Sequence, residues 1–230
     1  FVDHEKPIKR LINYKNGIWK VKSRNKEQMF AMNLLMNPNI PIVSLVGRAG
    51  SGKTLCAIAA GLEQIMGNDE KTYKRLIVSR PVQPLGKDIG FLPGTMEEKM
   101  HPWLMPVQDN LQFLMGDDRA TLELYMEKGQ IEVEALTYIR GRSISNAYII
   151  IDEAQNLTTH EIKTIITRVG EGTKIIFTGD IEQIDNVYVV ETTNGLTYAI
   201  EKLKNSDLTG HITLQKGERS KVATLAAKML

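Results

Sequence analysis

The sequence predicts one α/β domain with a mainly parallel sheet, and three observations carry this prediction. Short apolar runs alternate with segments of helical pattern along most of the chain. A glycine-rich loop joins one apolar run to a helical segment, and another apolar run ends in two adjacent carboxylates. Strands that alternate with helices form parallel sheets covered on both faces. A chain of 230 residues is long enough to bury one such core.

The expected elements follow one another in regular order after residue 25. The section from Arg80 to about Lys128 interrupts this order, and its prolines predict an irregular start that becomes helical from about Thr95. We expect strand 174–178 to lie between strands 42–46 and 148–152 in the sheet. The other expected strands are 76–79, 131–134 and 212–214, and the other expected helices are 26–36, 53–66, 159–169, 194–204 and 219–229.

Residues 1–24 are expected to form a basic segment in front of a domain that spans residues 25–230. Residues 1–26 hold eight Lys or Arg against two Asp or Glu. Apolar residues flank Asn16-Gly17, a pair that favours a tight turn, so a small β-hairpin is predicted. The hairpin would either contact a phosphate backbone or pack Ile18 and Trp19 on the core, with its basic residues in solvent.

Residues 47–54 match the phosphate-loop pattern G-x-x-x-x-G-K-[ST] at every fixed position. In such a loop, glycines let backbone N–H groups point at phosphate oxygens, and the following helix adds partial positive charge. Lys53 would reach the β- and γ-phosphates of ATP, and the Thr54 hydroxyl would ligate Mg²⁺. A chance match in a glycine-rich turn is the alternative, but both flanks agree with the motif. The expected nucleotide-binding residues are Gly47, Arg48, Ala49, Gly50, Ser51, Gly52, Lys53 and Thr54.

Polar residues follow two further strands and complete a hydrolytic site. Asp152 ends strand 148–152 and would hold Mg²⁺, while Glu153 would activate the attacking water. Glu153 could instead be a carboxylate that favours the start of a helix. Gln183 follows strand 174–178 and would sense the γ-phosphate, or else it lies in a surface turn.

Composition sets limits on the function. The net charge of +2 is too small to indicate a nucleic-acid partner by itself. The single cysteine, Cys56, rules out an internal disulfide and fits a reducing cytoplasm, where we expect the protein; packing is its expected role. The sequence shows no signal peptide and no apolar run long enough to span a bilayer. Because it begins with Phe1, we expect a fragment of a longer protein.

Together these motifs resemble the first motor domain of superfamily 1 helicases, and more closely the PhoH family of bacterial ATPases. The resemblance runs from about Asn25 to the C-terminus and implies a three-layer P-loop NTPase fold of RecA type. An extended segment in front of the domain, like residues 1–24, is similar to PhoH forms in which a PIN ribonuclease domain precedes the PhoH module. Besides the phosphate loop, the resemblance rests on Arg80-Pro81-Val82-Gln83, Gly90-Phe91-Leu92-Pro93-Gly94, Arg140-Gly141-Arg142-Ser143, Asp152-Glu153-Ala154-Gln155 and Gly179-Asp180-Ile181-Glu182-Gln183.

The resemblance implies roles for further residues. Gln28 would contact adenine, and Arg219 would act as an arginine finger on the transferred phosphoryl group. Gln28 could also be an ordinary helix-start residue, and Arg219 a surface arginine. Arg80, Arg140 and Arg142 are candidates for contacts with RNA or the γ-phosphate.

The resemblance also implies an assembly, because residues 184–230 are too few for a second motor domain. A homo-oligomeric ring, of hexameric type, would close the site, and we expect Arg219 to act across its subunit boundary. The expected function is Mg²⁺-dependent ATP hydrolysis coupled to binding or unwinding of single-stranded RNA. The alternatives are an ATPase that remodels or assembles proteins and a nucleotide-gated scaffold for an upstream nuclease.

Overall fold

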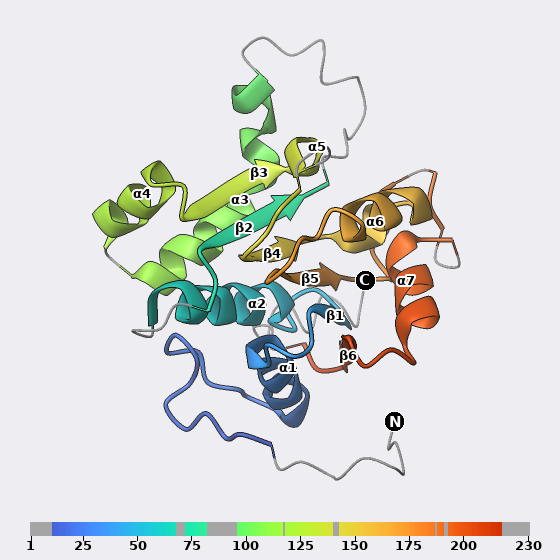
Figure 1. Cartoon of the computed structure of the whole chain (residues 1–230), viewed down its shortest axis with the longest axis horizontal. Coiled ribbons are helices and arrows are strands. Elements are labelled where there is room, and N and C mark those ends of the chain that lie inside the picture. Colours follow the sequence, from blue (N-terminus) through green and yellow to red (C-terminus); the bar gives the residue numbers. More distant parts are fainter. Residues whose placement is uncertain are drawn as a thin grey trace, which may run out of the picture.

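The computed structural model describes residues 11–67, 72–81, 96–116, 118–139, 143–186, 188–190 and 193–217. Its centre is a six-stranded sheet in the order β3-β2-β4-β5-β1-β6, and every strand pair in it is parallel (Figure 1). The predicted place of β5 between β1 and β4 is confirmed. The strands are β1 Ile42–Gly47, β2 Arg75–Arg80, β3 Ile131–Ala135, β4 Ala147–Ile151, β5 Lys174–Gly179 and β6 Thr209–Leu214.

Helices cover both faces of the sheet, which confirms the predicted three-layer architecture (Figure 1). On one face, side chains of α1, α2, α3 and α4 pack with β1, β2 and β4 in one apolar cluster. On the other face, α5, α6 and α7 pack with β4 and β5 in a second cluster. The helices are α1 Lys26–Met36, α2 Lys53–Leu62, α3 Met96–Met115, α4 Arg119–Glu127, α5 Leu136–Ile139, α6 Thr159–Ile166 and α7 Gly195–Leu203.

After residue 25, each predicted strand and helix that falls within the described residues is present, with differences at some ends. The helix expected at 53–66 is α-helical to Leu62 and then continues as a π-helical turn, Glu63–Gly67. The helical section expected from Thr95 is divided into α3 and α4, and Gly116, with φ of +69°, lies in the break. The helix predicted at 219–229 lies outside the described residues. Within the described ranges, no helix is long and apolar enough to cross a bilayer.

The predicted hairpin around Asn16-Gly17 is wrong in its strands and its turn. An antiparallel bridge joins Ile18 to Val21, so the turn residues are Trp19 and Lys20, both with positive φ. Trp19 is fixed from outside the segment, since its backbone N–H donates to Glu63 Oε2 at 3.0 Å and its indole donates to the Leu114 carbonyl at 2.9 Å. These tertiary contacts determine the turn in place of local preference. Ile18 is buried in the core, as the packing alternative expected.

Lys174 at the start of β5 ties the sheet to the end of α1. Its side chain is buried, and Nζ donates to the carbonyls of Leu34, Asn37 and Ile40 at 2.9, 2.8 and 2.6 Å. These carbonyls lie around the C-terminal end of α1, where helical C=O groups lack partners within the helix. One lysine therefore donates to three part-buried carbonyls, of which those of Leu34 and Asn37 also accept from a backbone N–H.

We predict that Lys174→Met lowers the free energy of unfolding by about 2–4 kcal/mol, because three part-buried carbonyls lose a hydrogen bond from the ammonium group. Urea denaturation would measure this. Lys163→Met, at an exposed lysine on α6, should stay within about 0.5 kcal/mol of the parent.

Burial lowers the pKa of Lys174 from 10.5 to about 7. The unfolded chain then holds an extra proton between these values, so stability should rise with pH there, and Lys174→Met should lack that rise. Equal stability of the two lysine variants would contradict the prediction.

Candidate nucleotide-binding and hydrolysis site

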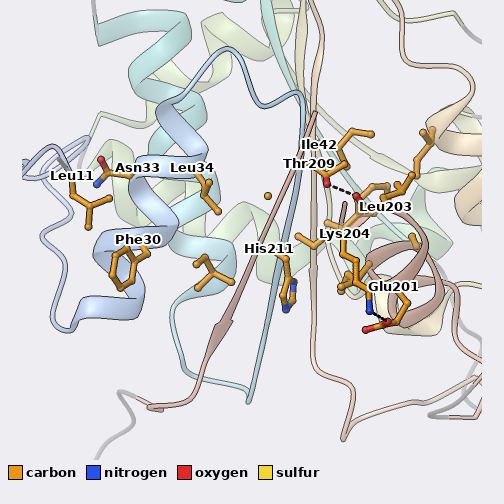
Figure 2. Close-up of a pocket in the computed structure, with 17 residues that line it drawn as sticks. Leu11, Phe30, Asn33, Leu34, Ile42, Glu201, Leu203, Lys204, Thr209 and His211 are labelled. Atoms are coloured by element: carbon orange, nitrogen blue, oxygen red, sulfur yellow. Dashed lines mark hydrogen bonds and ion pairs between the residues drawn. The ribbon is translucent and has the colours of Figure 1, made fainter. Parts of the chain in front are cut away.

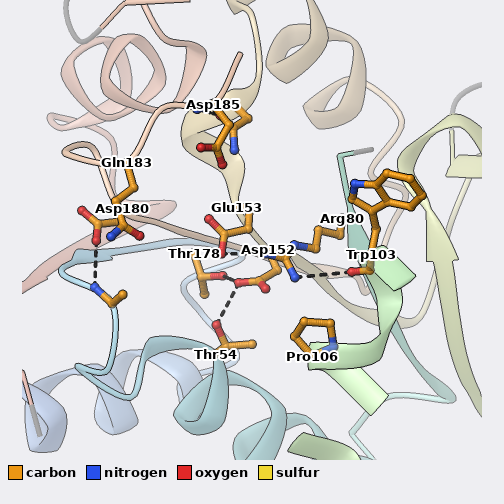
Figure 3. A network of polar contacts seen from close by, with 12 residues as sticks. Thr54, Arg80, Trp103, Pro106, Asp152, Glu153, Thr178, Asp180, Gln183 and Asp185 are labelled. Carbon is orange, nitrogen blue, oxygen red and sulfur yellow. Dashed lines mark hydrogen bonds and ion pairs between the residues drawn. The ribbon is translucent and has the colours of Figure 1, made fainter. Parts of the chain in front are cut away.

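The carboxyl ends of β1, β4 and β5 meet at one edge of the sheet, and the predicted site residues gather there (Figure 3). The arrangement follows from the parallel pairing of these neighbouring strands, since ligand sites of open α/β sheets lie outside the carboxyl ends. A pocket of about 240 Å³ opens between the segments that follow the strands. Its lining includes Lys53, Thr54, Asp152, Glu153, Asp180 and Gln183.

The phosphate loop runs between β1 and α2 in a conformation that suits an anion. Gly50 and Gly52 have φ of +80° and +85°, values that favour glycine. The backbone N–H of Ala49 donates to Asp180 Oδ2 at 2.7 Å, so this amide already points at a carboxylate oxygen. Lys53 Nζ donates to the carbonyls of Gly47 and Arg48 within the loop. The loop therefore fits a phosphate, which would compete with Asp180 for the amide and with the two carbonyls for the ammonium group.

Thr54 and Asp152 form the part of the site that fits Mg²⁺. Asp152 Oδ1 accepts hydrogen bonds from the hydroxyls of Thr54 at 2.8 Å and Thr178 at 2.5 Å. Hydroxyl and carboxylate oxygens are the hard ligands that Mg²⁺ prefers. Thr178 was not among the predicted residues. It lies beside Asp152 because Ile151 of β4 is in register with Phe177 of β5, which places the next residue of each strand side by side.

Glu153 lies at the mouth of the site and is held from two sides. Its backbone has φ of +54°, in the left-handed region that non-glycine residues seldom adopt. Oε1 forms an ion pair with Arg80 Nη2 at 3.0 Å, and Oε2 accepts a hydrogen bond from Gln155 Nε2 at 2.6 Å. Arg80 also donates to the Trp103 carbonyl of α3 at 3.3 Å. The structure thus places Arg80, a predicted RNA or γ-phosphate contact, against the candidate base.

Gln155 connects the acidic segment after β4 to the loop that carries Gln183. Its amide is fully buried, and Nε2 donates to the Gln183 carbonyl at 2.8 Å while Oε1 accepts from the Asp180 backbone at 3.1 Å. Gln183 itself lines the pocket, and its role as a sensor of the γ-phosphate stays a prediction. Sequence reasoning gave no role to Gln155, although it belongs to the Asp-Glu-Ala-Gln motif, and none to Asn110 of α3, which also lines the pocket.

Gln28 contacts the phosphate loop rather than presenting a free amide. It is buried, Nε2 donates to the Ser51 carbonyl at 3.0 Å, and Oε1 accepts from the Arg24 backbone at 2.8 Å. Gln28 also lines a second pocket of about 430 Å³, which shares Gly50, Gly52 and Leu55 with the first. This pocket also includes Lys20, Lys22, Arg24, Cys56 and Phe113. Burial raises the pKa of Cys56 to about 12, which favours an unreactive packing thiol there.

A larger pocket, of about 540 Å³, lies elsewhere and has different chemistry (Figure 2). It is next to the edge strand β6, with Leu11, Phe30 and Leu34 on one side and Leu203 of α7 on the other (Figure 2). Its lining is largely apolar and includes no residue of the phosphate loop or of the acidic segment after β4. Pocket size alone therefore does not locate the candidate site, which is defined by convergent polar groups.

A family model described as "PhoH-like protein" matches residues 20–229. The chain belongs to the PhoH family. It is 52% identical over 225 residues to "Protein PhoH2" of Bacillus subtilis (strain 168), an alignment that covers 97% of this chain and 50% of the relative. It is 41% identical over 162 residues to "PhoH-like protein" of the same organism, covering 70% of this chain and 49% of that protein. The chain thus spans about half the length of the curated PhoH relatives it matches.

The PhoH chain also has a fold seen in a solved large terminase. The large terminase of a thermophilic bacteriophage superposes with a TM-score of 0.50 and 13% identity, covering 90% of this chain and 50% of that one. At this identity the likeness concerns the fold alone. The sequence and the fold together identify a P-loop ATPase domain of the PhoH family, a class that uses nucleotide and usually Mg²⁺. Three predicted arginines, Arg140, Arg142 and Arg219, lie outside the described residues.

Proposed function

We propose that this PhoH-family domain hydrolyses ATP with Mg²⁺ and couples hydrolysis to binding or unwinding of single-stranded RNA. One observation carries the hydrolytic part. The phosphate loop, the Thr54–Asp152 pair and Glu153 line one pocket at the carboxyl edge of the sheet. That constellation provides an anion cradle, hard metal ligands and a candidate base within one small volume.

Each residue has a distinct role in the proposed reaction. Lys53 leaves its loop carbonyls to bind the β- and γ-phosphates, and the Ala49 amide exchanges Asp180 for a phosphate oxygen. Thr54 and Asp152 would hold Mg²⁺, which when bound neutralises charge on the phosphates. Glu153 takes a proton from the attacking water at a carboxylate oxygen. Gln183 senses the γ-phosphate. The side-chain amide of Gln155 donates to both the Gln183 carbonyl and the Glu153 carboxylate, so a movement of Gln183 would reach Glu153 through Gln155. We also propose that the adenine base occupies the pocket beside Gln28, with Phe113 at its wall.

The RNA part of the proposal is supported by basic residues close to the nucleotide site. Lys15, Lys20 and Lys22 are exposed, and the latter two line the pocket beside the phosphate loop. Lys20 and Lys22 therefore have a second candidate role, in contacting the nucleotide itself. The alternative functions are remodelling or assembly of proteins and a nucleotide-gated scaffold for a nuclease domain elsewhere in a longer protein.

We propose a homo-oligomeric ring, of hexameric type, as the working form, in the cytoplasm. The proposed ring is supported by the exposure of the site, since Glu153 keeps 32% of its side chain exposed. A neighbouring subunit would exclude water from such a site and strengthen electrostatic stabilisation of the transition state. The location is supported by the single buried cysteine.

The experiment that tests the proposal is ATP turnover of the assembled oligomer with and without single-stranded RNA, in Mg²⁺ and after chelation by EDTA. Turnover that needs Mg²⁺ and rises with RNA is the expected result. Turnover that RNA does not change would favour the protein-remodelling function. No turnover, with ATP still bound, would favour the scaffold.

RNA binding should fall steeply as salt rises, because the candidate contacts are lysines and arginines that act mainly on phosphates. We predict that each lost contact lowers the slope of log K against log salt by about 0.7 on a single strand. Fluorescence anisotropy of a labelled oligouridine across a salt series would measure the slope for single alanine variants. Absence of binding at low salt, in either nucleotide state, would contradict the prediction. The candidates are Lys15, Lys20, Lys22, Arg80, Arg140 and Arg142.

A further inference from the structure

Arg80 is a predicted phosphate contact whose side chain the structure places against the candidate base. It is the last residue of β2, the strand next to β4, and its guanidinium reaches the acid that follows β4 (Figure 3). Nη2 pairs with Glu153 Oε1 at 3.0 Å, and Nη1 donates to the Trp103 carbonyl at 3.3 Å. Arg80 therefore joins the candidate base to helix α3.

The ion pair affects what Glu153 can do. With Oε1 on Arg80 and Oε2 on Gln155, both carboxylate oxygens already hold hydrogen bonds. Each oxygen keeps a second lone pair, but a general base must aim it at the attacking water, and these two contacts fix the direction in which the carboxylate points. The left-handed backbone of Glu153 fits a residue held in place by its contacts, since such strain persists only where surrounding groups fix it. In this arrangement Arg80 competes with water for the carboxylate.

The contact is also accessible enough to be exchanged. The Arg80 side chain is 20% exposed and that of Glu153 is 32% exposed, so solvent screens the pair and little free energy is needed to part it. A guanidinium offers five donors in a planar fork that matches phosphate oxygens. A phosphate of a bound polynucleotide at the carboxyl edge of β2 would be a strong competitor for Arg80.

We propose that Arg80 is a positioning residue that restrains Glu153 in the resting site and releases it when a polynucleotide phosphate binds the guanidinium. This inference rests on the proposed RNA-coupled ATPase function and deepens it, because it names the group through which RNA would reach the base. The movement of Arg80 between Glu153 and a polynucleotide phosphate links the ATP hydrolysis site to the RNA-binding site. No contact with ATP is required of Arg80.

The structure supplies a matched control on the same strand. Arg75, at the start of β2, pairs with Glu132 at 3.0 Å, and their side chains are 29% and 21% exposed. The strand, the type of pair and the exposure are alike, but Arg75 lies at the opposite end of the sheet from the candidate site. Arg75→Gln should therefore reproduce any general effect of losing an ion pair on β2.

The first arm of the test measures turnover of Arg80→Gln, Arg80→Lys and Arg75→Gln with and without an oligouridine. Coupled sites commonly change each other by about 5- to 150-fold, and stimulation of the parent protein should lie in that range. In Arg80→Gln the RNA-free rate should rise and the stimulation should fall towards one, whereas Arg75→Gln should behave as the parent. A lower rate with unchanged stimulation would overturn the inference, because Arg80 would then only support Glu153.

The second arm needs no hydrolysis. Glu153→Gln removes the charge that holds Arg80, so it should bind the labelled oligouridine more tightly than the parent. Its slope of log K against log salt should match that of the parent, because Arg80 contacts a phosphate in both complexes. Adding Arg80→Gln should abolish the gain in affinity and lower the slope by about 0.7, one phosphate contact on a single strand.

These two arms separate this inference from the proposed function. If the parent protein fails to hydrolyse ATP, the proposed function is wrong, and the binding arm still tests Arg80. If the parent hydrolyses ATP but Glu153→Gln binds RNA no better, only the Arg80 inference is wrong. An oligouridine that binds none of the proteins also overturns it, since Arg80 then has no phosphate to meet.

Discussion

Glu153→Gln should bind ATP as the parent does and hydrolyse it about 10²–10⁴-fold more slowly, the usual cost of losing a general base. Glutamine keeps the size of the side chain and an amide oxygen that can still accept from Gln155 or Arg80. It cannot take a proton from water at neutral pH. Nucleotide titration and phosphate release, measured on the same sample, would separate binding from turnover.

Two comparisons make the Glu153 prediction specific. Lys53→Ala should weaken nucleotide binding itself, because the ammonium group is the proposed contact with the β- and γ-phosphates. Glu171→Gln, at an exposed glutamate that follows α6, should leave both measurements unchanged. Near-normal turnover in Glu153→Gln would remove Glu153 from the mechanism and return it to the helix-start interpretation.

The sequence predicted the central site because its motifs coincide with strand ends. In a parallel sheet, residues that follow neighbouring strands meet at one edge whatever lies between them in the chain. The phosphate loop, Asp152, Glu153 and Gln183 could therefore be placed together from the chain order alone. The position of β5 between β1 and β4 then brings Gln183 to the same pocket.

The contacts that depend on side chains from distant elements could not be predicted in this way. The pairing of Arg80 with Glu153 depends on β2 lying next to β4, while the two residues are 73 positions apart. The turn at Trp19 depends on Glu63 and Leu114, which no local pattern reveals. The sequence gives no sign that the Lys174 side chain donates to α1, because the contact depends on how α1 packs against the sheet. Each of these contacts joins elements that are distant in the chain, and only at Trp19 did they replace the locally preferred turn.

The path of the chain after β6 bears on how Arg219 would act. Leu214 of β6 is in register with Gly47 of β1, at the start of the phosphate loop. Three residues later, a Cβ placed on Gly217 would lie 3.8 Å from the Ala49 carbonyl oxygen. The last described residue before the C-terminal segment therefore lies near its own phosphate loop. Arg219 lies outside the described residues, so its action across a subunit boundary stays a prediction, with action on its own phosphate loop as the alternative.

Arg219→Ala should lower turnover by about 10³–10⁵-fold, the range typical of arginine fingers, and leave ATP affinity close to that of the parent. Arg219→Lys should recover little, because an ammonium cannot donate to two phosphoryl oxygens at once. Lys216→Ala, at a neighbouring exposed lysine, is the matched control and should stay active.

A mixture of Arg219→Ala and Lys53→Ala subunits, with subunit exchange confirmed by fluorescent labels, decides whether Arg219 acts on its own phosphate loop or on that of a neighbouring subunit. If Arg219 acts on its own loop, every subunit in the mixture is defective and the sample stays inactive. Recovered turnover would show that an intact loop had met an intact finger from its neighbour, and would assign Arg219 to the adjacent subunit of the ring.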